Sequence, residues 1–216
     1  MNNHEHWQQV FANKSAQQMS WSQSADDATF LAFKRLGLPM SAHIVEAGCG
    51  ISEWSAKALD DGYQHLTLID ISKRALEHLM KEHKNRQLEN QACRYLELDL
   101  SVADSHKLSD LQNSVDCWID RAVFHFMTSR AEKLNYINKL SSCLKKQGTV
   151  VLATFSENGP EKCSNLPVQR YSHEQLLQFL ETSEFGAFKC LDHWQQEHTT
   201  PWGAPQSFNW WIIQRL

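Results

Sequence analysis

Short apolar runs alternate with amphipathic segments along most of the chain. The runs at residues 44–45, 66–70, 95–100, 115–120 and 149–155 have the length and composition of buried strands. Between them, apolar residues recur at helical spacing, which is typical of helices that pack against a sheet. This alternation predicts an α/β protein with a mostly parallel sheet and helices on both faces.

Both ends of the chain depart from the alternation. Residues 1–38 have a polar, helical pattern and no linker separates them from the first strand, so we interpret them as an N-terminal helical cap on a core of residues 39–216. Residues 188–194 and 208–215 have the pattern of two strands joined by a loop at 197–206. The short return predicts that the last strand is antiparallel. We expect all 216 residues to form a single domain.

A glycine turn follows the first predicted strand. Glu46, Gly48 and Gly50 form an acidic-x-G-x-G sequence directly before a predicted helix at 52–59. Asp70 ends the next strand about twenty residues later, where nucleotide-binding βαβ units place a carboxylate that binds ribose. The order of strand, glycine turn, helix and strand-ending acid therefore predicts a cofactor that contains a ribose.

Two classes of cofactor fit this unit, and departures from the dinucleotide pattern separate them. In G-x-G-x-x-G sites the helix N-terminus faces a pyrophosphate, but the third glycine position here is Glu53, whose carboxylate would repel phosphate. A short-chain dehydrogenase also needs a Tyr-x-x-x-Lys pair, whereas Leu140 follows Tyr136 at that spacing. S-adenosylmethionine has no phosphate and carries cationic groups that tolerate nearby acids. The sequence thus favours S-adenosylmethionine over NAD or FAD.

These motifs resemble those of the class I S-adenosylmethionine-dependent methyltransferases. The glycine turn, Asp70, and Asp99 at the end of the third predicted strand match the first three motifs of that family. The chain also resembles a small bacterial-type subgroup with S-W-x-Q near the N-terminus (residues 20–23) and D-R-A-V-F-H-F after the fourth strand (residues 120–126). L-K-K-Q-G at 144–148 departs from the family's L-K-P-G-G turn. The resemblance implies a Rossmann-like, doubly wound sheet of seven strands, the last antiparallel.

The resemblance also implies which residues bind the cofactor. Asp70 would accept hydrogen bonds from the ribose hydroxyls, and Asp99 would accept one from the adenine amine. Glu46 would either contact the ammonium group of the cofactor or organise the glycine turn. Trp21 would either stack on the adenine or sulfonium, or serve only as a packing anchor. The expected cofactor-binding residues are Trp21, Glu46, Gly48, Gly50, Asp70, Ile71, Asp99, Leu100 and Asp120.

Candidate catalytic and acceptor-binding residues follow from position and chemistry. His125 and His198 are the candidate catalytic residues, because histidine titrates near neutral pH. His125 lies between two phenylalanines, where a structural hydrogen bond is the more common role. The loop that carries His198 should overhang the carboxyl edge of the sheet, together with tryptophans of the cap. The expected acceptor-site residues are Arg121, Cys163 and Trp202.

Composition restricts the partners. A formal net charge of −4 gives no electrostatic reason to expect nucleic acid. No apolar run approaches the ~20 residues that cross a bilayer, and no signal peptide pattern begins the chain, so we expect a cytoplasmic protein without membrane association. The six cysteines form no C-x-x-C pair and are expected to be free thiols. The histidines show no ligand spacing, so we predict no metal.

The sequence therefore predicts a methyltransferase that transfers the sulfonium methyl group by in-line displacement to a nucleophile on a small molecule. The motif N/D/S-P-P-aromatic of nucleic-acid amino methyltransferases is replaced by D-R-A-V at 120–123. A protein side chain as the acceptor, or a module that binds S-adenosylmethionine without catalysis, remain the alternatives. The sequence predicts neither the acceptor's identity nor the oligomeric state.

Overall fold

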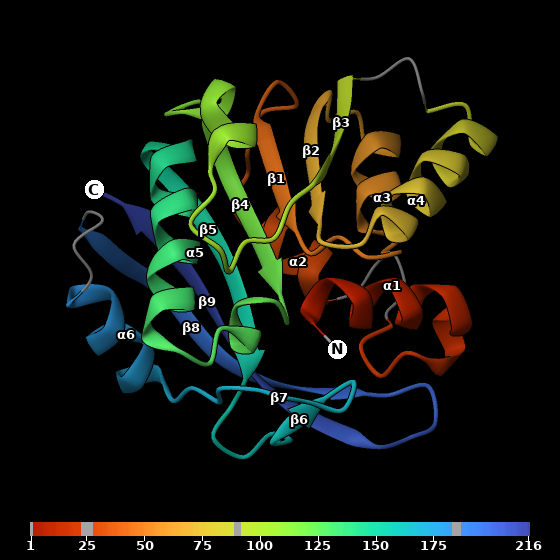
Figure 1. The fold of residues 1–216 in the computed structure, drawn as a ribbon. Helices are drawn as coiled ribbons and strands as arrows, with labels where there is room; N and C mark the ends of the chain where they lie inside the picture. Colours follow the sequence, from red (N-terminus) through yellow and green to blue (C-terminus); the bar gives the residue numbers. More distant parts are fainter. Residues whose placement is uncertain (1, 23–27, 89–91, 183–186) are drawn as a thin grey trace.

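The computed structural model describes residues 2–22, 28–88, 92–182 and 187–216, and its centre is a seven-stranded sheet (Figure 1). The strand order is β3-β2-β1-β4-β5-β9-β8. Neighbouring strands are parallel except for the pairs that involve β9, which is antiparallel to both β5 and β8. The strands are β1 (His43–Ala47), β2 (His65–Asp70), β3 (Ala92–Glu97), β4 (Val115–Arg121), β5 (Leu144–Phe155), β8 (Phe188–Thr199) and β9 (Pro205–Arg215). This arrangement confirms the fold class expected from the sequence.

Helices cover both faces of the sheet, as the alternating pattern predicted. They are α1 (Asn3–Asn13), α2 (Ala28–Lys34), α3 (Trp54–Asp60), α4 (Lys73–Asn85), α5 (Arg130–Cys143) and α6 (His173–Glu181), with short 3₁₀ turns η1 (Ala16–Gln18), η2 (His106–Leu111) and η3 (Phe124–Phe126). Ser72, Ser129 and Ser172 begin α4, α5 and α6, and each side chain accepts a hydrogen bond from a first-turn backbone N–H. These caps explain why the helices begin where they do.

Two apolar layers enclose the sheet. Residues of α2, α3 and α4 pack with one face of the central strands, and residues of α5 and α6 pack with the other. The largest fully buried side chains include three tryptophans, namely Trp118 on β4 and the consecutive residues Trp210 and Trp211 on β9. Since the central strands are covered on both sides, they are apolar almost without interruption, as parallel sheets require.

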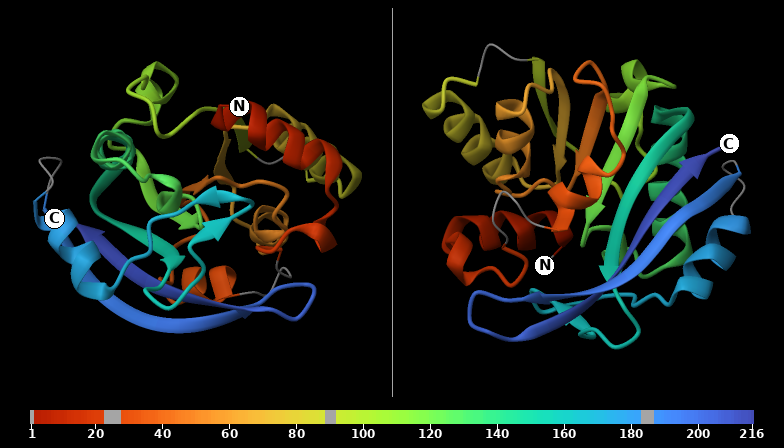
Figure 2. Two further views of the ribbon diagram at one scale, coloured as in Figure 1. Left: turned by 60° about the horizontal axis from the view of Figure 1, so that its bottom comes forward. Right: turned by 180° about the vertical axis from the view of Figure 1, so that it is seen from behind.

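The carboxyl ends of the parallel strands are the edge that positions the site. Strand order reverses between β1 and β4, and doubly wound sheets bind ligands beyond the strand ends at such a point. Helix α1, the small hairpin of β6 (Lys162–Cys163) and β7 (Leu166–Pro167), and the tip of the β8–β9 hairpin gather at this same edge (Figures 1 and 2). The N-terminal segment thus covers the edge at which a ligand is expected.

Several boundaries differ from the sequence-based expectations. Half of the predicted loop at 197–206 is strand, because β8 and β9 stay paired from Phe188↔Arg215 to Thr199↔Pro205. Strand β3 ends at Glu97, so Asp99 follows the strand instead of closing it. Strand β5 begins at Leu144 and therefore includes the predicted turn at 144–148. Gln23, the last residue of the S-W-x-Q motif, lies outside the described residues.

Candidate functional site

A cavity lies beyond the carboxyl ends of β1, β2, β3 and β4. The empty space within it, including its open mouth, is about 1320 Å³. The strand ends and the turns that follow them form its floor, and the N-terminal segment forms its cover. Expected site residues that line it are Trp21, Glu46, Gly48, Gly50, Asp70, Ile71, Asp99, Leu100, Arg121 and Cys163. The cavity therefore brings together residues from the N-terminal segment, as early as Asn3, and residues as late in the chain as Cys163.

Both glycines of the turn after β1 are required by the backbone. Gly48 has φ +61°, and a Cβ atom there would lie 2.1 Å from Cγ2 of Val123. Gly50 has φ +54°, and its Cβ would lie 3.3 Å from Cζ of Phe11. Since a left-handed backbone and close neighbours both exclude a side chain, the turn forms a cradle in which the backbone faces the cavity directly.

Asp70 joins the glycine turn to the end of β2. Its Oδ2 accepts a hydrogen bond from the backbone N–H of Gly50 (2.8 Å), and its Oδ1 accepts one from the N–H of Ser72 (2.7 Å). A carboxylate offers about four lone-pair positions, so it retains acceptors for a ligand's hydroxyl groups. Burial raises the pKa of Asp70 to about 6, although the backbone hydrogen bonds oppose this shift.

Acidic groups on the neighbouring strands complete the floor of the cavity. Glu46 on β1 is buried, and its Oε1 accepts a hydrogen bond from Oγ of Ser52 at 2.6 Å. Asp99 follows β3, and its Oδ1 accepts hydrogen bonds from the N–H (2.8 Å) and Oγ (2.6 Å) of Ser101. The carboxylates of Glu46, Asp70 and Asp99 therefore come from three adjacent strands and are each held by hydrogen bonds within the chain.

Aromatic side chains cover the cavity. The ring of Trp7 on α1 lies edge-on to Trp21 (5.6 Å between ring centroids) and to Phe126 (5.2 Å), and Phe11 lies one helical turn further along α1. These four residues all line the cavity. The cover is therefore apolar and aromatic, whereas the floor carries the carboxylates.

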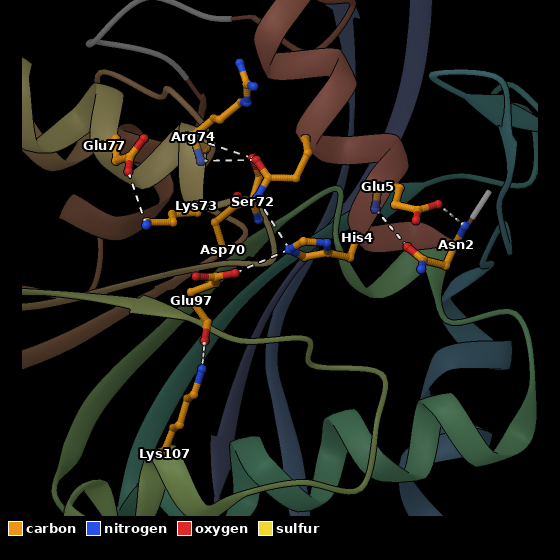
Figure 3. Close-up of polar contacts among 12 residues, drawn as sticks. Asn2, His4, Glu5, Asp70, Ser72, Lys73, Arg74, Glu77, Glu97 and Lys107 are labelled. Atoms are coloured by element: carbon orange, nitrogen blue, oxygen red, sulfur yellow. Dashed lines mark hydrogen bonds and ion pairs between the residues drawn. The ribbon is translucent and has the colours of Figure 1, made fainter.

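Polar contacts hold α1 against the strand ends. Oε1 of Gln8 accepts hydrogen bonds from Oγ of Ser72 (3.1 Å) and from the backbone N–H of Arg74 (3.3 Å). His4 approaches Oε1 of Glu97 at 3.3 Å through its Nε2 (Figure 3). Figure 3 shows that these contacts reach the start of α4 and the end of β3, on either side of Asp70. The cap is thus joined to the segments that carry the cofactor motifs.

Arg121 on β4 and Cys163 on β6 both line the cavity. The guanidinium group of Arg121 donates a hydrogen bond to the carbonyl of Trp21, which connects β4 to the cap. The thiol of Cys163 is buried, and burial raises its pKa to about 11. Cys163 is consequently a neutral thiol at physiological pH.

His125 differs from the expectation of a catalytic base. It is fully buried against Phe126 and Phe155, and it is not among the residues that line the cavity. Its Nδ1 accepts a hydrogen bond from the backbone N–H of Phe155 at 3.4 Å. Burial, with a smaller contribution from Arg121, lowers its pKa to about 3. A neutral imidazole enclosed in this way has a structural role.

Asp120 also differs from the expectation, because it does not line the cavity. Its carboxylate accepts hydrogen bonds from the N–H groups of Val123 and Phe124 (2.9 Å each) and from the hydroxyl of Tyr136. Burial raises its pKa to about 7. Asp120 therefore fixes the turn after β4 and holds Val123 against Gly48.

The β8–β9 hairpin does not place its side chains in the cavity. Nε2 of His198 makes a hydrogen bond of 2.7 Å with the carbonyl of Ser20, so this residue supports the cap. Trp202 is 59% exposed at the tip of the hairpin. Trp194 stacks on Trp210 instead of entering the cavity. The strand pairing continues to Thr199↔Pro205, which leaves a connection of five residues, none of which lines the cavity.

Sequence reasoning missed other residues that line the cavity, among them Phe11, Met19, Ser52, Trp54 and Phe126. The i, i+4 spacing of Trp7 and Phe11 was a detectable signal, but such a stripe is as typical of packing as of a binding site. In the described part of the chain, no group of three or more His, Cys, Asp or Glu side chains could hold a metal ion. None of the described helices is long and apolar enough to cross a membrane.

Solved structures with this fold include methyltransferases. The chain is similar to an S-adenosylmethionine-dependent methyltransferase from Anabaena variabilis, with 17% identity, a TM-score of 0.74, and coverage of 100% of this chain and 96% of that one. It is also similar to 1,6-didemethyltoxoflavin-N1-methyltransferase from Burkholderia thailandensis, whose structure holds S-adenosylhomocysteine (15% identity, TM-score 0.68, 98% and 83% coverage). A cyclase, SpnF, is similar as well (16% identity, TM-score 0.68, 94% and 85% coverage). At these identities the likeness shows the fold alone.

The fold is thus that of the S-adenosylmethionine-dependent methyltransferases. More particularly, residues 44–148 match the family model for a methyltransferase domain, and this segment contains the glycine turn, Asp70 and Asp99. No curated protein matches the sequence. The domain match and the fold together support S-adenosylmethionine as the cofactor.

Proposed function

We propose that this protein is an S-adenosylmethionine-dependent methyltransferase whose acceptor is a small molecule. The observation that carries the proposal is the buried carboxylate of Asp70 beside the side-chain-free turn of Gly48 and Gly50, inside a covered cavity. A ribose, a purine and an amino acid each find suitable groups there. The covered, aromatic acceptor side supports a small molecule over a folded protein.

The residues that would hold the cofactor follow from the donors and acceptors present. Asp70 accepts hydroxyl hydrogen bonds, Asp99 accepts from an exocyclic amine, and the Glu46 carboxylate attracts an ammonium group. The cradle of Gly48 and Gly50 permits close approach of the ligand to the backbone. S-adenosylmethionine, when bound, supplies an electrophilic methyl group on a sulfonium with a good thioether leaving group.

The chain's contribution to the reaction is mainly alignment and exclusion of water. Trp7, Trp21 and Phe126 cover the space in which an acceptor meets the methyl group. No histidine is among the residues that line the cavity within the described part of the chain. We therefore infer an acceptor that arrives as a neutral or anionic nucleophile, for which orientation and desolvation are the principal sources of acceleration.

Ligand binding and labelled methyl transfer test this proposal together. S-adenosylhomocysteine should raise the melting temperature, because a ligand at 100 times its Kd stabilises the native state by about 2.7 kcal/mol, and NADH should not. Incubation with methyl-labelled S-adenosylmethionine and a cell extract should then label the low-molecular-mass fraction. Label in the protein fraction would favour a protein acceptor, and binding without labelled product would favour a non-catalytic module. A response to NADH alone would contradict the proposal.

The affinity for S-adenosylhomocysteine should also depend on pH. Asp70 has a pKa of about 6 in the absence of ligand, and ribose hydroxyls donate to its ionised form. Protonation below that value removes acceptors, so affinity should fall as the pH drops from about 7 to about 5, by at most about tenfold per unit. Calorimetry across this range measures the effect. A flat profile would show that Asp70 does not bind the ligand in its ionised form.

A further inference from the structure

Lys139 on α5 is a buried lysine that the proposed reaction does not use. Only 1% of the residue is exposed. Its Nζ donates hydrogen bonds to the backbone carbonyls of Leu100 (3.5 Å) and Val102. Burial lowers the pKa of Lys139, and the nearby carboxylates of Asp99 and Asp104 partly offset this. Because an isolated buried ammonium is costly, this carbonyl cradle indicates a specific role.

Asn135 binds the same loop one helical turn earlier. Its Nδ2 donates a hydrogen bond to the carbonyl of Ser101 at 2.8 Å. Residues four apart lie on the same face of a helix, so Asn135 and Lys139 together hold the carbonyls of residues 100, 101 and 102. Three consecutive carbonyls of the loop after β3 are thereby fixed to α5.

This loop carries part of the cavity wall. Asp99, Leu100 and Ser101 all line the cavity. The Asp99 carboxylate is oriented by the N–H and Oγ of Ser101, whose own carbonyl is held by Asn135. The position of the carboxylate therefore depends on how firmly α5 holds the loop.

We propose that Lys139 and Asn135 are positioning residues that set the Asp99 carboxylate to recognise the 6-amino group of adenine. The inference rests on the proposed function, because it assigns the wall after β3 to the cofactor's purine. An amine donates a hydrogen bond to a carboxylate, whereas a purine with hydrogen at the 6-position has no donor there. A correctly held Asp99 should therefore distinguish adenine from the 6-deamino purine, and a loosened one should not.

Two probes that differ at one purine position test this directly. S-adenosylhomocysteine and its 6-deamino analogue, in which hydrogen replaces the 6-amino group of the purine, differ only at that position, and calorimetry measures the Kd of each. The wild-type protein should prefer S-adenosylhomocysteine by about tenfold or more, as one charge-assisted hydrogen bond predicts. Lys139→Met, which keeps the volume of the side chain, should lose most of this preference while the affinity for the 6-deamino analogue changes less than twofold.

Control variants separate positioning from general stability. Lys146→Met removes an exposed lysine outside the cavity and should keep the full preference. Asn135→Ala removes one hydrogen bond to the loop and should reduce the preference to a smaller extent, which keeps the test available if Lys139→Met does not fold. Equal weakening of both ligands, or an unchanged preference in both loop variants, would overturn the inference. Failure of the wild-type protein to bind S-adenosylhomocysteine would instead refute the proposed function.

Discussion

Asp70→Asn is expected to weaken binding of S-adenosylhomocysteine by about 10- to 100-fold, because hydrogen bonds to a charged acceptor contribute roughly 1.5–3 kcal/mol. An amide has one carbonyl oxygen in place of two carboxylate oxygens. It cannot accept from the N–H groups of Gly50 and Ser72 on opposite sides and also from two ribose hydroxyls. Calorimetry with S-adenosylhomocysteine measures the loss.

The same substitution should lower the melting temperature of the ligand-free protein. Besides facing the cavity, Asp70 satisfies two backbone N–H groups in the ligand-free protein. Leaving one of them unsatisfied costs about 1–3 kcal/mol. Glu53→Gln, at an exposed acid outside the cavity, is the matched control and should change neither quantity. Unaltered affinity in Asp70→Asn would exclude Asp70 as the ribose ligand.

Gly48→Ala is expected to be the most damaging glycine-to-alanine change among the glycines that the structure describes. The left-handed backbone at φ +61° costs a non-glycine residue about 1–3 kcal/mol. The new Cβ would also lie 2.1 Å from Cγ2 of Val123, and overpacking of this kind adds about 1–3 kcal/mol. Thermal unfolding should show a decrease of roughly 5–20 °C, at about 2–4 °C per kcal/mol for a chain of this size.

Two comparisons isolate the clash from the backbone strain. Gly37 has φ +59° with nothing within 4 Å of its Cβ position, so Gly37→Ala measures the strain alone. Adding Val123→Ala to Gly48→Ala should recover part of the lost stability and of the affinity for S-adenosylhomocysteine. Equal melting temperatures for Gly37→Ala and Gly48→Ala would show that Val123 does not press on the turn.

The cofactor side of the site was predictable because its signals are local. Gly48, Gly50 and Asp70 belong to one βαβ unit, in which the covalent chain itself sets their separation. Strand and helix periodicity placed that unit at the carboxyl edge of a parallel sheet. Motifs of this kind can be recognised from sequence, since the backbone conformation that they need restricts the residue types.

The side chains proposed for catalysis and acceptor binding were less predictable, because long-range packing decides which side chains enter the cavity. Asp120 lies near the end of the fourth strand and His125 follows that strand, as reacting groups would, yet both side chains are buried in the core, where they accept hydrogen bonds from backbone N–H groups. His198 binds the cap and Trp202 remains exposed. The reason is that β8 and β9 remain paired up to Thr199↔Pro205, although the polar residues at 197–206 predicted a loop there.

The sequence by itself determined the order of strands and helices, the glycine turn and the strand-ending acid, since periodicity and backbone restrictions are properties of neighbouring residues. Only the tertiary structure decided that α1 covers the cavity through Trp7 and Phe11, and that Lys139 holds the loop of Asp99. These contacts join residues more than thirty positions apart. Their partners are chosen by the packing of whole elements, which no local pattern encodes.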